Sequence, residues 1–204
     1  MTRGFDFIGK KAHCVLGLVG LFIFMIPTST TANQVQEEEW AYLPPYCWAR
    51  LRPSNEQEVR QWKDILGPDF EHVHHFCFAQ AFMRRSLSPR KNSNNKNYDL
   101  QVAKSNLEYV FSHLESPRYV LLPEINILMG KVYERLGEGF LAIRYYQKAI
   151  DIKADFPQGY AVFSDYYKRQ GDLEMARELL VKGMEQNPDS IILKRRIDRL
   201  NSGS

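Results

Sequence analysis

Apolar positions between residues 123 and 190 recur at the three- and four-residue intervals of amphipathic helices. The recurring apolar residues are Ile127, Met129 and Val132 in one segment, and Leu141, Ile143, Tyr146 and Ile150 in the next. The same order of apolar, small and aromatic positions starts again at Pro157, 34 residues after Pro123. We therefore expect two successive hairpins, each made of two antiparallel helices.

Small residues in both copies lie where the two helices of a hairpin have to approach closely. The residues expected to face each other are Gly130 with Ala142 and Ala149, and Ser164 with Ala176 and Gly183. Gly137 and Gly171 follow the first helix of each hairpin, where glycine supplies the left-handed turn that ends a helix. Pro157 and Pro188 open the units that follow, because a helix tolerates proline in its first turn.

This spacing resembles the tetratricopeptide repeat, a unit of about 34 residues with small, aromatic and proline residues at fixed positions. The matching residues are Gly130, Tyr133, Gly137, Ala142, Tyr146 and Ala149 in the first copy, and Tyr160, Phe163, Ser164, Tyr167, Gly171, Ala176, Leu180, Gly183 and Pro188 in the second. The resemblance implies an all-α fold in which antiparallel helix pairs stack into a right-handed superhelix. It also implies a protein that binds other proteins.

Sequence on both sides of these repeats supplies neighbours, which a repeat needs because it buries its apolar face only against the next unit. Residues 123–156 and 157–190 would be the two repeats, and 191–204 a capping helix and tail that buries Ile191, Ile197 and Leu200. Upstream, residues 68–122 predict a divergent helical hairpin or a degenerate repeat. Its helices would cover 68–86 and 98–114, with a polar loop over 87–97, and residues 33–67 would be an N-terminal extension.

The first 32 residues have the pattern of a secretory signal peptide. Arg3, Lys10 and Lys11 precede an apolar stretch over residues 12–26, and small residues follow that suit cleavage after Ala32. The stretch is shorter than the ~20 residues that span a bilayer. We therefore expect export to the bacterial periplasm or cell envelope. The alternative is an uncleaved segment that anchors the protein in the inner membrane through residues 12–26.

Removal of that segment leaves the chain close to neutral. The whole sequence has 27 Lys and Arg against 24 Asp and Glu, and the first 32 residues hold three of the basic and one of the acidic residues. The mature protein would keep 24 basic and 23 acidic side chains. This near-neutral balance gives little support for nucleic acid as a partner, and export argues against it.

Two of the three cysteines, Cys47 and Cys77, would remain in the mature protein. An even pair in an exported chain favours a disulfide bond. The bond would hold the extended segment before Cys47 against the first helix of residues 68–122. The alternative is two buried free thiols that pack as small apolar side chains.

Histidines crowd the same helix. His72 and His75 share one face, whereas His74 and Cys77 share another. Two ligands on one face are too few for a specific metal site, so we expect neither a metal nor a cofactor. A metal- or haem-handling accessory protein that uses the helix from His72 to Cys77 is the alternative function.

Catalytic patterns such as a glycine-rich phosphate loop or a nucleophile elbow do not occur in the sequence. We expect the acidic run at residues 37–39 to belong to a solvated linker and Asp165 to lie on a helix surface without a partner. The sequence therefore indicates a non-enzymatic protein.

The resemblance also implies where a partner binds, because the first helix of each repeat lines a concave groove in this family. The candidate groove residues of this chain are Phe76, Glu124, Ile127, Lys131, Arg135, Asp165, Lys168 and Arg169. We expect a groove of mixed charge with an apolar end near Phe76 and Ile127. Its basic strip would meet an acidic stretch of the partner.

The leading hypothesis is an exported scaffold or assembly factor of the cell envelope that binds a partner protein in this groove. A homo-oligomer formed by stacked repeats is an alternative occupant, because a single C-terminal helix would cover the end of the array only in part.

Overall fold

The computed structural model describes residues 35–89 and 91–202, and the predicted signal segment of residues 1–32 lies outside the described residues. The helices are η1 (Glu37–Tyr42), α1 (Pro45–Leu51), α2 (Glu56–Leu66), η2 (Pro68–His72), α3 (Val73–Ser86), α4 (Ser93–His113), α5 (Leu122–Arg135), α6 (Gly139–Ile152), α7 (Pro157–Gln170), α8 (Leu173–Gln186) and α9 (Ile191–Asn201). The described residues contain no strand. Within these ranges, no helix combines the length and the apolarity needed to cross a bilayer.

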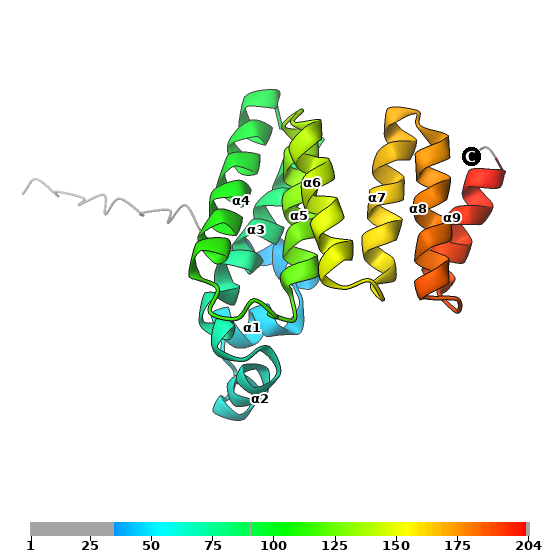
Figure 1. Cartoon of the computed structure of the whole chain (residues 1–204). Coiled ribbons are helices and arrows are strands. Elements are labelled where there is room, and N and C mark those ends of the chain that lie inside the picture. Colours follow the sequence, from blue (N-terminus) through cyan, green and yellow to red (C-terminus); the bar gives the residue numbers. More distant parts are fainter. Residues whose placement is uncertain (1–34, 90, 203–204) are drawn as a thin grey trace, which may run out of the picture. The chain divides into compact units, whose positions relative to one another are not determined.

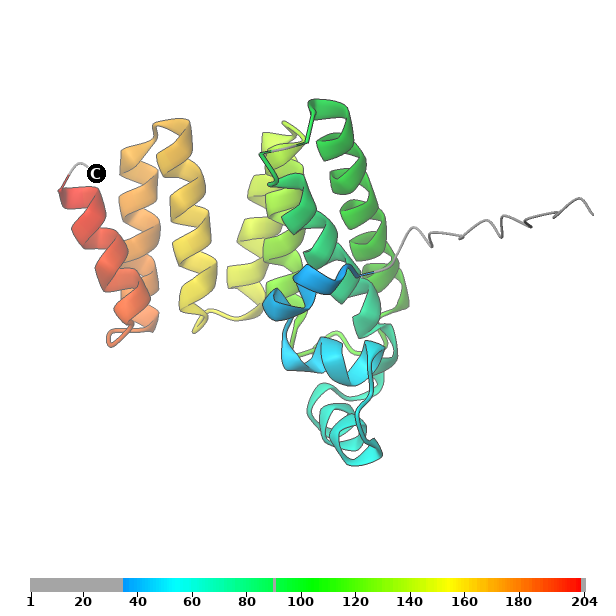
Figure 2. The same cartoon turned by 180° about the vertical axis from the view of Figure 1, so that it is seen from behind.

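Consecutive helices pack as antiparallel pairs, α3 with α4, α5 with α6 and α7 with α8 (Figure 1). The first helices of successive pairs also touch, α3 with α5 and α5 with α7, and α9 packs against both helices of the last pair (Figure 2). The expected all-α stack of helix pairs is therefore confirmed. The first helices lie next to one another in this stack, so their side chains can form a shared surface.

Glycine allows the close approach within and between pairs. A Cβ atom on Gly130 would lie 2.6 Å from the fully buried ring of Tyr146. Tyr146, rather than Ala142 or Ala149, therefore provides the nearest atoms to Gly130. In the next pair, the Ser164 hydroxyl donates a 2.8 Å hydrogen bond to the Ala176 carbonyl, as the facing pattern predicted.

The two turn glycines have the predicted backbone conformation. Gly137 and Gly171 have φ angles of 81° and 82°, in the left-handed region that favours glycine. After Gly171, the Asp172 carboxylate accepts a 3.0 Å hydrogen bond from the Met175 amide and caps α8. These local signals set the boundaries of α7 and α8.

The polar stretch predicted as a loop over 87–97 is shorter in the structure, because α4 begins at Ser93. The Asn92 side chain accepts a 2.9 Å hydrogen bond from the Asn95 amide and caps the helix. The residues that follow are mostly weak helix formers. The cap and the packing of α4 on α3 therefore outweigh their low propensity.

α9 buries a different residue from the one expected. Leu193 is fully buried, whereas Ile191 is 63% exposed. The Ser190 hydroxyl caps the helix by accepting a hydrogen bond from the Leu193 amide. Ile191 is thus the first residue of the helix, and Leu193 lies close to Gly183 of α8.

Candidate functional site

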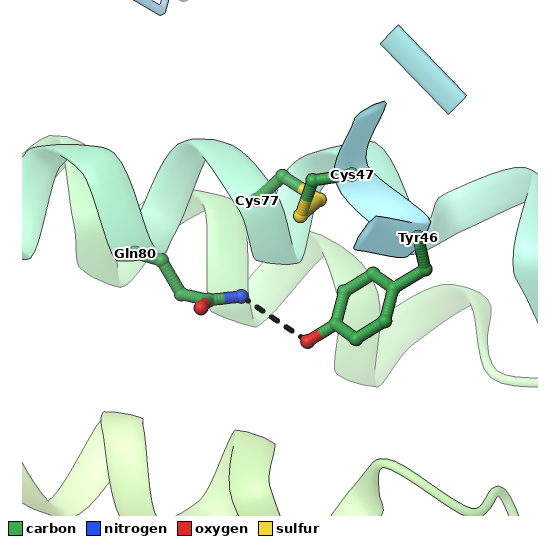
Figure 3. The surroundings of a disulfide bond; sticks show 4 residues. All are labelled: Tyr46, Cys47, Cys77 and Gln80. Atoms are coloured by element: carbon green, nitrogen blue, oxygen red, sulfur yellow. Dashed lines mark hydrogen bonds between the residues drawn. A yellow bond between two sulfur atoms is a disulfide. The ribbon is translucent and has the colours of Figure 1, made fainter. Parts of the chain in front are cut away.

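Cys47 and Cys77 form the predicted disulfide bond, with their Cα atoms 5.7 Å apart. Figure 3 shows Tyr46 and Cys47 facing Cys77 and Gln80 of α3. The Gln80 amide donates a 3.4 Å hydrogen bond to the Tyr46 hydroxyl. The segment around Cys47 is helical from Pro45 onward rather than extended, since proline fits the first turn of α1. The disulfide therefore fixes α1 on α3.

Glu39 provides a second attachment of the N-terminal segment, so the expectation of a solvated linker over residues 37–39 is wrong for Glu39, whereas Glu37 and Glu38 are exposed. The Glu39 carboxylate is 4% exposed and forms a two-point ion pair with Arg85 of α3, with Arg85 Nη2 at 2.6 Å. The same carboxylate accepts a 2.7 Å hydrogen bond from the Gln36 amide. The partner of Glu39 lies 46 residues away in sequence, so a local pattern gives no sign of it.

A cleft of about 540 Å³ lies where η1, α3, α5 and α7 meet. Its lining residues are Glu39, Tyr42 and Leu43 from the N-terminal segment, Gln80, Ala81, Met83, Arg84 and Leu87 from the α3 region, Leu128, Lys131, Glu134 and Arg135 from α5, and Arg169 from α7. This size lies within the range of ligand-binding clefts, which is about 300–1,000 Å³. We refer to these residues below as the cleft.

Three of the predicted groove residues line the cleft: Lys131, Arg135 and Arg169. Sequence reasoning missed the wall that Glu39, Tyr42 and Leu43 provide, because it treated their segment as an extension. The Arg84 guanidinium lies 3.2 Å from the centroid of the Tyr42 ring. This cation–π contact adds to the ion pair of Glu39 in holding η1 beside α3.

The other five predicted residues lie elsewhere. Phe76 and Ile127 are in the core, at 3% and 6% exposure, and the Phe76 ring stacks on Tyr46. Asp165 pairs with Arg196 of α9 at 2.9 Å, so the expectation that it lacks a partner is wrong. Glu124 and Lys168 do not line the cleft. Burial raises the pKa of Glu124, and its buried Oε2 has no hydrogen-bond partner.

Glu134 neutralises one of the cleft's cations. Arg169 donates to both of its carboxylate oxygens, at 2.7 and 2.9 Å, and the Tyr146 hydroxyl donates to Oε2 at 2.7 Å. Such a two-point arginine–carboxylate pair is geometrically specific. Arg169 therefore serves to join α5 to α7.

Lys131 has a different environment. It is half-buried, and burial, followed by the nearby charge of Arg169, lowers the pKa of its ammonium group. Arg135 lies one turn further along α5 and is exposed. Lys131 and Arg135 therefore present two positive charges from the same face of α5 into the cleft.

The histidine helix has contacts that explain its composition without a metal. Cys77 is used in the disulfide, and the His75 Nδ1 lies 2.7 Å from the Asn106 Oδ1. The His75 ring stacks on Tyr109, with ring centroids 3.7 Å apart. Burial lowers the pKa of His74 to about 4. In the part of the chain that the structure describes, no three His, Cys, Asp or Glu side chains are placed to hold a metal ion.

Part of the chain resembles a known family of repeats. Residues 123–156, which span most of α5 and all of α6, match the family model of the tetratricopeptide repeat. No curated protein matches the chain. Proteins with this repeat are generally non-catalytic scaffolds that bind other proteins. Residues 123–156 are thus similar to a tetratricopeptide repeat, and they lie within an all-α stack of helix pairs.

Proposed function

We propose that this protein is a non-enzymatic scaffold or assembly factor that binds a segment of a partner protein in the cleft. The observation that carries the proposal is the position of the cleft, which is lined by the first helices of three successive helix pairs. Binding surfaces of helical repeat proteins are built from such successive elements. The proposal includes residues 157–190 as a second repeat and residues 68–122 as a divergent one.

We also propose that the protein works outside the cytoplasm, in the periplasm or cell envelope. The signal-like pattern of residues 1–32 and the Cys47–Cys77 disulfide support this location, because disulfides persist in oxidising compartments. A second copy of the chain is the competing occupant of the cleft.

The test fills the cleft and leaves the fold intact. Leu128→Trp places an indole on the cleft floor, and Val181→Trp adds the same group to an exposed position of α8 as a matched control. We expect mass spectrometry to identify host-envelope proteins that co-purify with the wild type and with Val181→Trp, and that are lost with Leu128→Trp. Circular dichroism would verify equal helicity.

Two results would contradict the proposal. One is an identical set of co-purifying proteins for both variants. The other is a wild-type protein that self-associates in sedimentation analysis and becomes monomeric with Leu128→Trp, which would assign the cleft to a second copy.

A further inference from the structure

We propose that the cleft selects a partner segment that carries Asp or Glu side chains among apolar ones, and that Lys131 and Arg135 bind its carboxylates. This inference rests on the proposed function and names the chemistry of the partner. It follows from which charges of the cleft are already used within the chain.

The carboxylates of the cleft are both engaged. Glu39 pairs with Arg85, and Glu134 pairs with Arg169 while also accepting the Tyr146 hydroxyl. Against these two acids, the cleft presents four cations, one of which is Arg169. The excess of positive charge therefore lies on Arg84, Lys131 and Arg135.

Among the residues that the structure describes, these three cations form no ion pair. No carboxylate in residues 35–89 or 91–202 lies within the 4.0 Å distance of an ion pair with Arg84, Lys131 or Arg135. The charges of Asp165 and Glu134 also act on Lys131, but Asp165 is paired with Arg196 at 2.9 Å and Glu134 with Arg169 at 2.7 Å. The cleft thus keeps a positive charge that a ligand can neutralise.

The spacing of Lys131 and Arg135 favours a shared ligand. Like charges four residues apart on a helix repel each other, which destabilises the helix. Burial of Lys131 adds a desolvation cost, as the lowered pKa of its ammonium indicates. A carboxylate between the two side chains would reduce their repulsion and offset the desolvation of Lys131, and it would form charge-assisted hydrogen bonds.

The rest of the lining favours a ligand that also carries apolar groups. Leu43, Met83 and Leu128 are apolar and face the same cleft. Three cations distributed over α3 and α5 suit several side-chain carboxylates better than one terminal carboxylate. The occupant that fits both features is a short segment in which acidic residues alternate with aliphatic or aromatic ones.

The binding test uses the full chain as purified and three short fluorescein-labelled peptides. One peptide intersperses Glu with Leu, the second replaces each Glu with Gln, and the third replaces each Glu with Lys. We expect fluorescence anisotropy to show that the Glu peptide binds at least about tenfold more tightly than the Gln peptide, a difference of about 1.4 kcal/mol. The preference should shrink as added salt screens the charges.

Variants then assign the preference to α5. Lys131→Gln with Arg135→Gln should weaken binding of the Glu peptide about tenfold and leave the Gln peptide unchanged. The matched control is Lys182→Gln with Arg195→Gln, which makes the same change in net charge at two exposed residues outside the cleft. It should alter binding by less than about twofold.

The inference is overturned if the wild type binds neither the Glu peptide nor its Gln counterpart, or binds them equally well. It is also overturned if the cleft and control double variants behave alike. Leu128→Trp separates this failure from a failure of the proposed function. If Leu128→Trp still removes partner binding, the cleft remains the binding site and only the charge preference is wrong.

Discussion

Tyr146 shows how one side chain sets the distance between two helices. Its ring is fully buried against Gly130, and its hydroxyl donates to Glu134. The hydrogen bond satisfies the one polar group of a ring that otherwise packs as an apolar one. Because the ring is held at both ends, Gly130 has no room for a larger residue.

Gly130→Ala should therefore destabilise the protein, although alanine is the better helix former by about 1 kcal/mol. The new methyl group would overlap ring atoms of Tyr146 at 2.6 and 2.7 Å, and overpacking of this kind costs about 1–3 kcal/mol. Thermal unfolding followed by circular dichroism would measure the loss. Gly139→Ala is the control, because its methyl group would meet only the Tyr166 hydroxyl, at 2.9 Å. Equal melting temperatures for the two variants would contradict this interpretation.

At the scale of elements, η1 and α1 depend on long-range attachments. η1 is held by the Glu39–Arg85 ion pair, and α1 by the Cys47–Cys77 disulfide. α1 has only seven residues, too few for a stable isolated helix. The wall that these elements add to the cleft should therefore depend on the disulfide.

Replacing both cysteines with alanine should release this segment before the repeats unfold. Closure of a loop with a sequence separation of 30 residues corresponds to about 3–4 kcal/mol in the chain-entropy model. The chain's three tryptophans, Trp40, Trp48 and Trp62, all lie in residues 35–66. In the variant, urea should change tryptophan fluorescence at lower concentration than helical circular dichroism, whereas both signals should coincide more closely in the oxidised wild type.

A reductant provides the control for this experiment. It should separate the two transitions in the wild type and have no effect on the variant that lacks Cys47 and Cys77. Coincident transitions in reduced wild-type protein would show that the segment stays attached without the disulfide.

The sequence was sufficient to predict those helix boundaries that depend on residues close by in the chain. Gly137 and Gly171 end their helices as predicted, because a left-handed turn needs only a glycine at the correct spacing. The position of Glu39 was not predictable, since it depends on Arg85 in a distant helix. The position of Arg169 within the repeat pattern correctly predicted it as a residue of the cleft. Only the side-chain geometry shows that Glu134 neutralises its charge.

At the scale of the molecule, the described residues 35–89 and 91–202 belong to one compact unit whose two ends are secured differently. The N-terminal end has a covalent bond between α1 and α3. The C-terminal end relies on buried Leu193, the Asp165–Arg196 ion pair and a 2.6 Å hydrogen bond from Arg177 to Asn201. In a stack of repeats, a terminal unit with one neighbour is less stable than an internal one.

Hydrogen exchange should therefore show lower protection in α8 and α9 than in α3 and α5. The reason is that local opening of the last pair breaks only the interface on one side. Leu193→Ala should accelerate exchange in α7, α8 and α9 and leave α3 and α4 unchanged, as mass spectrometry of peptic fragments would measure. Acceleration throughout the chain would mean that the molecule unfolds only as a whole.

The network of Glu134, Tyr146 and Arg169 constrains how this sequence can change in evolution. Loss of the Glu134 carboxylate would leave a buried hydroxyl unsatisfied and a guanidinium without its counter-ion. A single change is therefore costly at this position, whereas a joint change of all three residues can be neutral. In descendants of this sequence, we expect the three positions to be inherited or replaced together.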